Sequence, residues 1–310
     1  MVRLLSFQNL EQNSTWYICG FEINICSIEQ ISDMEEYDVL YWKRSVTLNK
    51  TDNWASGDLY EPYVGRWSRL VAKGFLKWID VPTRSQWLDV GCGTGALSHA
   101  ILDTCDPQTV KGIDRSDGFV AYARNRVNDP RATFEVGDAQ SLPVDSELYD
   151  SVVSGLVLNF VPQPGKMVSE MARAVKEEGV VAVYVWDYAD KMQLMRYFWD
   201  AAIALDPAVA DLDESPRFPI CNPDALRELF QKAGLNQVET RAIDVDTHFK
   251  DFDDYWNPFL GGQGPAPTYA MSLSEEKRTQ LRERIRADLP FAADGSVPLV
   301  ARAWAVKGVK

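Results

Sequence analysis

The middle of the chain alternates between short apolar runs and amphipathic segments. Five apolar runs have the length and the bulky, β-branched composition of buried strands: 86–90, 109–113, 132–136, 149–155 and 179–186. Segments with apolar residues at helical spacing lie between most of them, at about 95–104, 117–127 and 164–176. This alternation predicts a mostly parallel sheet with helices on both faces.

The flanking regions follow a looser pattern. Helical spacing predicts a helix from Tyr60 to Trp78, and further helices and strands follow the alternating region: helices at about 191–205, 223–233 and 274–287, and strands near 236–244 and 297–306. The stretch 256–267 is dense in glycine and proline, so we expect a structured loop that folds over a ligand site as part of a lid. Residues 1–50 show neither a clean period nor a repeat, and they are treated as an N-terminal extension of unknown role.

Three glycines at alternate positions follow the first predicted strand. Gly91, Gly93 and Gly95 come directly before a predicted helix, and such a loop lets the backbone approach a nucleotide-like ligand closely. A phosphate-binding loop of the NTPase type needs Lys followed by Ser or Thr after the last glycine, but here Ala96 and Leu97 follow. That class of site is excluded.

Two cofactors remain for the loop. A dinucleotide remains possible because Gly91, Gly93 and Ala96 fit its permissive spacing and Asp114 lies about 20 residues further on. S-adenosylmethionine is favoured by Asp89, a carboxylate two residues before the first glycine. A pyrophosphate would be repelled by that charge, whereas a ligand with a cationic amino group and a sulfonium would be attracted to it, directly or through a water.

Composition narrows the function classes. The 310 residues include 45 acidic and 32 basic ones, which gives a formal net charge of −13 and argues against a nucleic-acid substrate. Five scattered cysteines and two histidines offer no metal-ligand spacing, so we expect a reducing compartment and no metal. No apolar run is long enough for a membrane span and no signal segment is evident, so a cytoplasmic protein that does not bind membranes is expected.

Four segments together resemble class I S-adenosylmethionine-dependent methyltransferases. Residues 88–95 are similar to their motif I, 112–114 to the acidic end of their second strand, and 137–143 to the loop that receives the adenine. Residues 149–154, with the strand after Gly179, resemble the fourth and fifth strands of the ubiquinone/menaquinone-biosynthesis-like branch. The resemblance covers roughly residues 60–190.

The resemblance implies a set of cofactor-binding residues. Asp114 would accept both ribose hydroxyls, Asp138 and the Ala139 amide would hydrogen-bond the adenine, and Phe119 and Leu142 would wall the base. Several of these residues also have a plain structural alternative, such as a strand-end carboxylate or an Asx turn. The full set is Tyr60, Arg66, Asp89, Gly91, Cys92, Gly93, Gly95, Asp114, Arg115, Asp138, Ala139, Ser154 and Gly155.

The acceptor side is less defined. Methyl transfer is an in-line displacement that proximity and desolvation can accelerate without a nucleophilic side chain, so no catalytic residue is required by the chemistry. Asp187 and His248 are the candidates for a polar contact or a base. Candidate acceptor-binding residues are Asn159, Trp186, Tyr188 and Trp256, although each aromatic ring also fits a role in the core.

The predicted fold is a Rossmann-like, doubly wound α/β domain over residues 51–310. It has a seven-stranded, mostly parallel sheet with an antiparallel C-terminal strand, a cofactor-binding core at about 80–190, and lid or acceptor insertions at about 187–235 and 246–295, with the N-terminal helix contributing to the lid. The expected activity is metal-independent methyl transfer to a small or medium-sized acceptor by a monomer or homodimer. The alternatives are an NAD-dependent oxidoreductase and a non-catalytic S-adenosylmethionine-binding protein.

Overall fold

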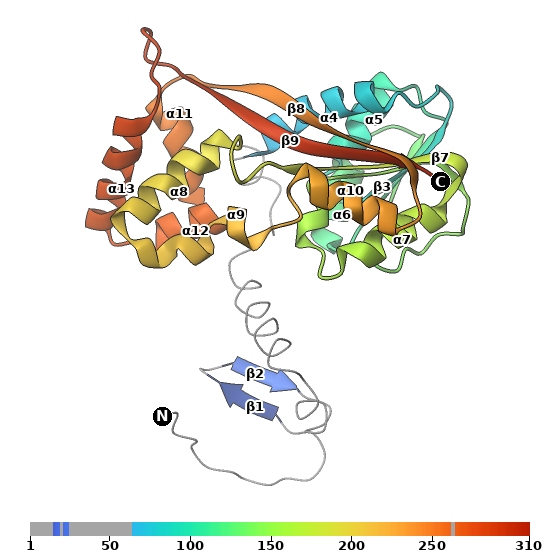
Figure 1. The fold of residues 1–310 in the computed structure, drawn as a ribbon, viewed down its shortest axis with the longest axis horizontal. Coiled ribbons are helices and arrows are strands. Elements are labelled where there is room, and N and C mark those ends of the chain that lie inside the picture. The colour runs from blue at the N-terminus through green and yellow to red at the C-terminus, as the bar shows by residue number, and fades with distance from the viewer. Residues whose placement is uncertain (1–14, 19–20, 25–63, 262–263) are drawn as a thin grey trace. The chain divides into compact units, whose positions relative to one another are not determined.

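A computed structural model describes the backbone of residues 15–18 and 21–24 and, with side chains, residues 64–261 and 264–310 (Figure 1). The chain divides into two compact units, Met1–Thr51 and Asp52–Lys310. In the first unit, strands β1 (Thr15–Ile18) and β2 (Phe21–Asn24) pair antiparallel. The predicted role of Tyr60 and the start of its helix lie outside the described residues.

The second unit is built on a seven-stranded sheet with the order β5-β4-β3-β6-β7-β9-β8. Its strands are β3 (Gln86–Val90), β4 (Thr109–Asp114), β5 (Ala132–Val136), β6 (Tyr149–Gly155), β7 (Val175–Trp186), β8 (Asn236–Phe249) and β9 (Val297–Val309). The strands β3 to β7 pair parallel, and β9 runs antiparallel to both β7 and β8. The predicted fold class is confirmed, down to the single antiparallel strand at the C-terminus.

Helices cover both faces of the sheet. On one face α4 (Arg66–Ile79) packs on α5 (Ala96–Thr104), and on the other α7 (Pro164–Ala174) lies beside α10 (Pro223–Lys232) (Figure 1). The remaining crossover helix, α6 (Asp117–Arg126), packs on β4 and β5. The predicted helices agree with these to within a few residues, because each buries apolar residues against the sheet.

A second group of helices gathers beyond the end of the sheet where β8 stops and β9 starts (Figure 1). It comprises α8 (Gln193–Leu205), η3 (Pro207–Leu212), α9 (Glu214–Arg217), α11 (Phe252–Trp256), η4 (Asn257–Gly261), α12 (Pro265–Ser272) and α13 (Glu275–Asp288). A further short helix, η2 (Leu158–Phe160), follows β6.

The prediction of a loop over 256–267 is wrong. Most of that stretch folds into η4 and α12, because Pro265 takes the first turn of α12, where the missing N–H has no helical partner to lose. Buried rings hold it in place: Phe259 stacks on Phe198 of α8 with centroids 4.6 Å apart. That these helices act as a lid stays a prediction.

We predict that Gly112→Ala destabilises the fold by about 1 to 3 kcal/mol, because the new methyl overpacks the core. Gly112 lies in β4, and a Cβ there would be 2.5 Å from Cδ1 of Phe134. Chemical denaturation would measure the change. The matched control is Gly118→Ala in the first turn of α6, where the nearest atom is Ser116 Oγ at 3.8 Å. That variant should be neutral or stabilised by about 0.5 kcal/mol, and equal losses in the two variants would contradict the steric argument.

Candidate functional site

The glycine loop lies at the carboxyl end of β3 and is fixed by close packing. The N–H groups of Gly91 and Cys92 both donate to the carbonyl of Ile113, at 2.7 and 3.0 Å. Gly91 has φ +74°, and a Cβ there would be 2.6 Å from a methyl group of Val157. Only glycine therefore fits this position, for both its backbone conformation and the contact it makes.

Asp114 ties the loops of three neighbouring strands together. It ends β4, and its two carboxylate oxygens accept from the N–H of Gly93 at 3.0 Å and from that of Ser116 at 2.9 Å. Its carbonyl accepts from the N–H of Gly137, after β5, at 3.0 Å. Burial raises the pKa of the Asp114 carboxyl, and the two N–H bonds partly oppose that rise by favouring the carboxylate.

Asp89 is buried just below the glycine loop. One of its carboxylate oxygens accepts from the Ser98 hydroxyl at 2.7 Å. Within the described part of the chain, the other oxygen is buried with no hydrogen-bond partner. Burial raises the pKa of Asp89 to about 7, and the Ser98 hydrogen bond lowers it. The site therefore holds a carboxyl group that a nearby cation would ionise.

Residues 137–143 form a tight turn after β5. The exposed Asp138 accepts from the backbone N–H of Gln140 at 2.8 Å, which is the Asx-type turn considered as an alternative. Leu142 is buried, and its N–H donates to Glu170 of α7 at 2.8 Å. Ala139 and Phe119 are half-buried, and Arg115 is exposed. The turn lies beside Asp114 through the Gly137 hydrogen bond, at the same edge of the sheet.

Arg66, the first residue of α4, is engaged elsewhere. Its guanidinium pairs with Asp254 of α11 at 3.0 Å and lies over the rings of Trp67 and Phe249, 4.3 and 4.8 Å from their centroids. The predicted contact with a cofactor carboxylate would compete with this ion pair. It stays a prediction.

The carboxyl end of β6 carries a strained turn. Leu156 has φ +63°, an unfavourable conformation for a residue with a Cβ, and its N–H donates to the Tyr184 carbonyl at 2.8 Å. The turn directs Val157 onto Gly91. Ser154, at the end of the same strand, is buried with its hydroxyl unpartnered within the described residues. Strain of this kind is concentrated at ligand sites.

Three aromatic rings from distant segments meet next to this turn. Phe218 packs edge-on against Phe160 of η2, with centroids 5.1 Å apart, and its ring is tilted by 43° against that of Tyr188, after β7, at 5.6 Å. Asp187, beside Tyr188, is buried and accepts from the N–H of Asp190 at 3.3 Å. Burial raises the pKa of Asp187. Of the predicted residues, Tyr188 thus belongs to this group and Asn159 precedes its member Phe160 in η2, while Trp186 is buried within β7.

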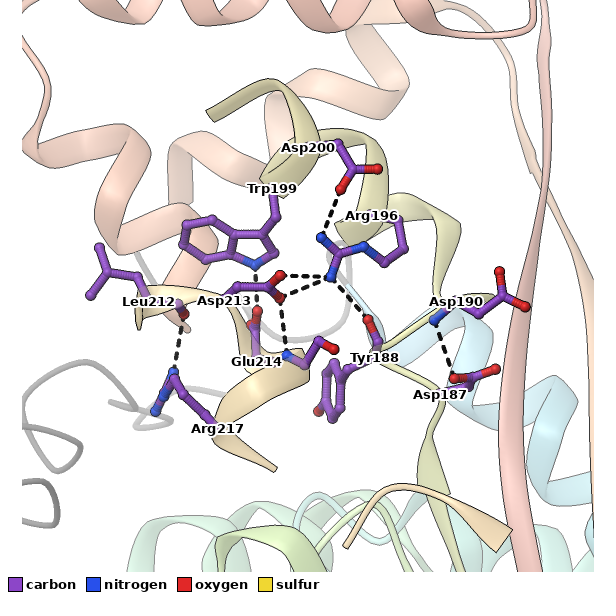
Figure 2. Close-up of polar contacts among 11 residues, drawn as sticks. Asp187, Tyr188, Asp190, Arg196, Trp199, Asp200, Leu212, Asp213, Glu214 and Arg217 are labelled. Atoms are coloured by element: carbon purple, nitrogen blue, oxygen red, sulfur yellow. Dashed lines mark hydrogen bonds and ion pairs between the residues drawn. The ribbon is translucent and has the colours of Figure 1, made fainter. Parts of the chain in front are cut away.

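A polar network secures the segment that carries Phe218 (Figure 2). Arg196 of α8 donates to both carboxylate oxygens of Asp213 at 2.8 and 2.9 Å, to Asp200 at 2.9 Å and to the Tyr188 carbonyl at 3.1 Å. Beside it, the buried Glu214 carboxylate accepts from the Trp199 indole N–H. Burial raises the pKa of Glu214 to about 7.

Two predicted acceptor-side residues lie apart from this group. Trp256 is buried in the helical group, with its ring 6.0 Å from that of Phe259. His248 is exposed on β8 and pairs with Pro298, whereas Trp186, beside Asp187, pairs with Ala303. These two partners are five residues apart along β9, so His248 and Trp186 lie at places about 17 Å apart along the strand direction, at the usual strand rise.

Sequence reasoning missed several residues of the site. Ser98 was detectable in principle, because it lies on the buried face of the helix that follows the glycine loop. Asp213 and Glu214 form an acidic start to a helix, but a helix of four residues gives no periodic signal. Phe218 and Val157 carried no signal, because their partners are distant in the sequence.

The carboxyl edge of the seven-stranded sheet carries a glycine loop, a strand-end carboxylate and an acidic turn. Together with the single antiparallel strand, these features define an α/β domain that binds a nucleotide cofactor. Residues 88–183 match the family model described as a methyltransferase domain. Residues 88–183 therefore form a methyltransferase domain whose cofactor is S-adenosylmethionine, and the chain is similar to the ubiquinone/menaquinone-biosynthesis-like branch of the class I enzymes.

Known proteins show how far the similarity reaches. The malonyl-[acyl-carrier protein] O-methyltransferase of Acetivibrio thermocellus is 30% identical over 40% of this chain and 44% of its own length. The 2-methyl-6-phytyl-1,4-hydroquinone methyltransferase of Synechocystis is 28% identical over 72% and 76%. A candidate methyltransferase from an antibiotic biosynthesis pathway of Anabaena variabilis shares the fold, with a TM-score of 0.55, 18% identity and coverage of 78% and 97%. The chain therefore spans less than half the length of the Acetivibrio thermocellus protein.

We predict that Glu214→Gln flattens part of the pH dependence of stability. The pKa of Glu214 is raised to about 7 in the fold, so the folded protein keeps a proton there that the unfolded chain loses above its ordinary value of 4.5. The wild-type protein should therefore lose stability as pH rises from about 4.5 to 7, by about 1 to 3 kcal/mol, and the glutamine variant should not.

Urea denaturation at pH 5, 6, 7 and 8 would measure this difference. Gln keeps an oxygen for the Trp199 N–H, so the fold is retained, and Glu283→Gln, an exposed glutamate of α13, is the control. Parallel pH profiles for the wild-type protein and Glu214→Gln would contradict the assignment.

Proposed function

We propose that the protein transfers a methyl group from S-adenosylmethionine to an oxygen, nitrogen or carbon nucleophile of a small or medium-sized, partly apolar acceptor. The observation that carries the proposal is the hydrogen-bonded link of Gly93, Asp114 and Gly137, which brings three cofactor-type loops to one edge of the sheet. The methyltransferase family match over residues 88–183 supports it independently.

The residues present fit that cofactor. Asp114 would accept from the ribose hydroxyls, since each of its oxygens has a further lone pair beyond the N–H that it already accepts. Asp138 and Ala139 would meet the adenine. Asp89, whose second oxygen is buried and unpartnered among the described residues, would favour the cationic amino group. A side chain at Gly91 would collide with Val157, so the loop keeps its backbone accessible.

Methyl transfer does not require a nucleophilic side chain. The bound cofactor supplies an electrophilic methyl group on a positively charged sulfur. The chain's residues would align the acceptor nucleophile with the methyl carbon and the sulfur and would keep water out. A base is needed only for an acceptor that binds protonated. Asp187 is the candidate for it, because its carboxyl is buried at the end of β7 and its pKa is raised.

The acceptor side supports a ring-bearing or apolar acceptor. Phe160, Tyr188 and Phe218 form an aromatic group beside the strained Leu156 turn, and two of the relatives carry the names of hydroquinone methyltransferases. Independence from metals, a cytoplasmic location and a monomer or homodimer stay part of this proposal. No helix among the described residues is long and apolar enough to cross a membrane.

Calorimetry is the direct test of the proposal. S-adenosylmethionine and S-adenosylhomocysteine should bind with micromolar affinity, and NAD⁺ or NADH should not bind. A labelled-methyl screen against metabolite pools would then identify the acceptor. Absence of cofactor binding at millimolar concentration would contradict the proposal, and binding without transfer to any pool would favour a non-catalytic protein.

We predict that Asp114→Ala weakens S-adenosylhomocysteine binding by about 1 to 3 kcal/mol, or roughly fivefold to 150-fold. The variant loses the ribose contact and also frees the N–H groups of Gly93 and Ser116. Asp117→Ala, an exposed carboxylate three residues further on, is the matched control and should leave the affinity unchanged. Equal affinities in Asp114→Ala and the wild-type protein would remove the assignment.

We also predict that S-adenosylhomocysteine binds more tightly as pH rises from 6 to 8. The raised pKa of Asp89, about 7, keeps the carboxyl neutral below that pH, and the cationic amino group of the ligand favours the ionised form. Affinity should rise by up to about tenfold per pH unit below the pKa and level off above it. Calorimetry across this range measures the profile.

Variants separate Asp89 from other groups in this pH profile. Asp89→Asn should bind more weakly at pH 8 and lose the dependence. Glu214→Gln removes the other carboxyl with a pKa near 7 and should retain it. A profile that disappears in Glu214→Gln, or persists in Asp89→Asn, would exclude Asp89 as its source.

A further inference from the structure

Asn159 carries a buried side-chain amide that the fold does not use. It lies in η2, directly after β6, and only 9% of the residue is exposed. Both the amide nitrogen and the amide oxygen are buried, and neither has a hydrogen-bond partner in the described structure. A primary amide can donate two hydrogen bonds and accept two, so all of its capacity remains for a ligand.

The turn before Asn159 places it at the ligand edge. The strained Leu156 (φ +63°) reverses the chain after β6, and Val157 then packs on the glycine loop at Gly91. Asn159 follows two residues later, and the next residue, Phe160, joins the aromatic group with Phe218. Asn159 thus lies in the short segment that joins Val157, which packs on the glycine loop, to Phe160 of the aromatic group, and this segment begins at a strained residue.

Leaving a buried amide unpartnered is unfavourable. No hydrogen bond offsets the free energy needed to remove the amide from water, so an apolar side chain of similar size would give a more stable protein. Groups that lower stability in this way are characteristic of functional sites, where the ligand completes the hydrogen bonds.

We propose that Asn159 binds the methyl acceptor through a paired hydrogen bond, so that the preferred acceptor carries a neighbouring donor and acceptor on a planar, uncharged group. The inference rests on the proposed function. A carboxamide or a lactam edge matches both amide atoms at once, whereas a lone hydroxyl or an ether meets one of them. An uncharged group fits, because a buried neutral amide can hydrogen-bond it but offers no opposite charge to compensate for the burial of an ion.

The test compares two buried, unpartnered polar residues, one at the ligand edge and one inside β6. Asn159→Leu removes the amide at the ligand edge. Ser151→Ala removes an equally unpartnered hydroxyl in the interior of β6, where Ser151 pairs with Trp87 and Val180 and is fully buried. Both variants should raise the Tm of the ligand-free protein, by about 2 to 6 °C. Asn159→Asp, which keeps the shape but adds a charge, serves as a second variant should the leucine disturb folding.

Binding of a probe then separates the roles of the two residues. With the protein saturated by S-adenosylhomocysteine, ligand-observed NMR would measure the affinity of benzamide and of N,N-dimethylbenzamide, which lacks the donor. Benzamide should bind the wild-type protein and Ser151→Ala equally, and Asn159→Leu and Asn159→Asp at least tenfold more weakly. The dimethyl analogue should bind all four proteins as weakly as benzamide binds Asn159→Leu.

Three results would overturn the inference: no benzamide binding to the wild-type protein, equal binding to the Asn159 variants, or a loss of S-adenosylhomocysteine affinity in those variants, which would assign Asn159 to the cofactor. Failure of the wild-type protein to bind S-adenosylhomocysteine would instead refute the proposed function, so the two failures are distinguishable.

Discussion

The architecture of the candidate site depends on how one carboxylate is hydrogen-bonded. Asp114 fixes the glycine loop through Gly93, begins α6 through Ser116 and holds the next loop through the N–H of Gly137. Three strand ends are thereby set relative to one another before any ligand arrives, which lowers the ordering cost of binding. The arrangement also explains why a carboxylate is kept at a buried position. Each of its two oxygens accepts a hydrogen bond from a backbone N–H group, and an apolar side chain would leave both N–H groups without a partner.

Around that fixed point, the site contains polar groups that the folded chain leaves incompletely paired. The second oxygen of Asp89, the hydroxyl of Ser154 and the amide of Asn159 are all buried without a partner among the described residues, and they lie along the ends of β3 and β6. Each lowers the stability of the ligand-free protein. Large buried rings such as Trp87, Phe75 and Trp199 make that tolerable, because they bury enough apolar surface to keep the fold stable.

The sequence was informative where local pattern and function coincide. Gly91 and Asp114 could be assigned because parallel strands read as continuous apolar runs and their carboxyl ends must share one edge. The short helices η4 and α12 could not be predicted, since Pro265 and the glycines around it resemble a loop and the helical form is packed against Phe198 of α8, which is distant in the sequence. Contacts such as Val157 on Gly91 join residues 66 positions apart, which no local pattern encodes.

The two sides of the site are therefore built differently. The cofactor side comes from consecutive strand ends, linked by backbone hydrogen bonds. The proposed acceptor side draws on three separate segments, which contain Phe160, Tyr188 and Phe218. Arg196 links two of them, because it donates to Asp213 and to the Tyr188 carbonyl. Changes in the segment 207–218 can reshape the acceptor side without moving Asp114 or the glycine loop. The family match covers residues 88–183 and so includes Asn159 but neither Tyr188 nor Phe218. This is the physical reason why the donor can be inferred from family resemblance while the acceptor cannot.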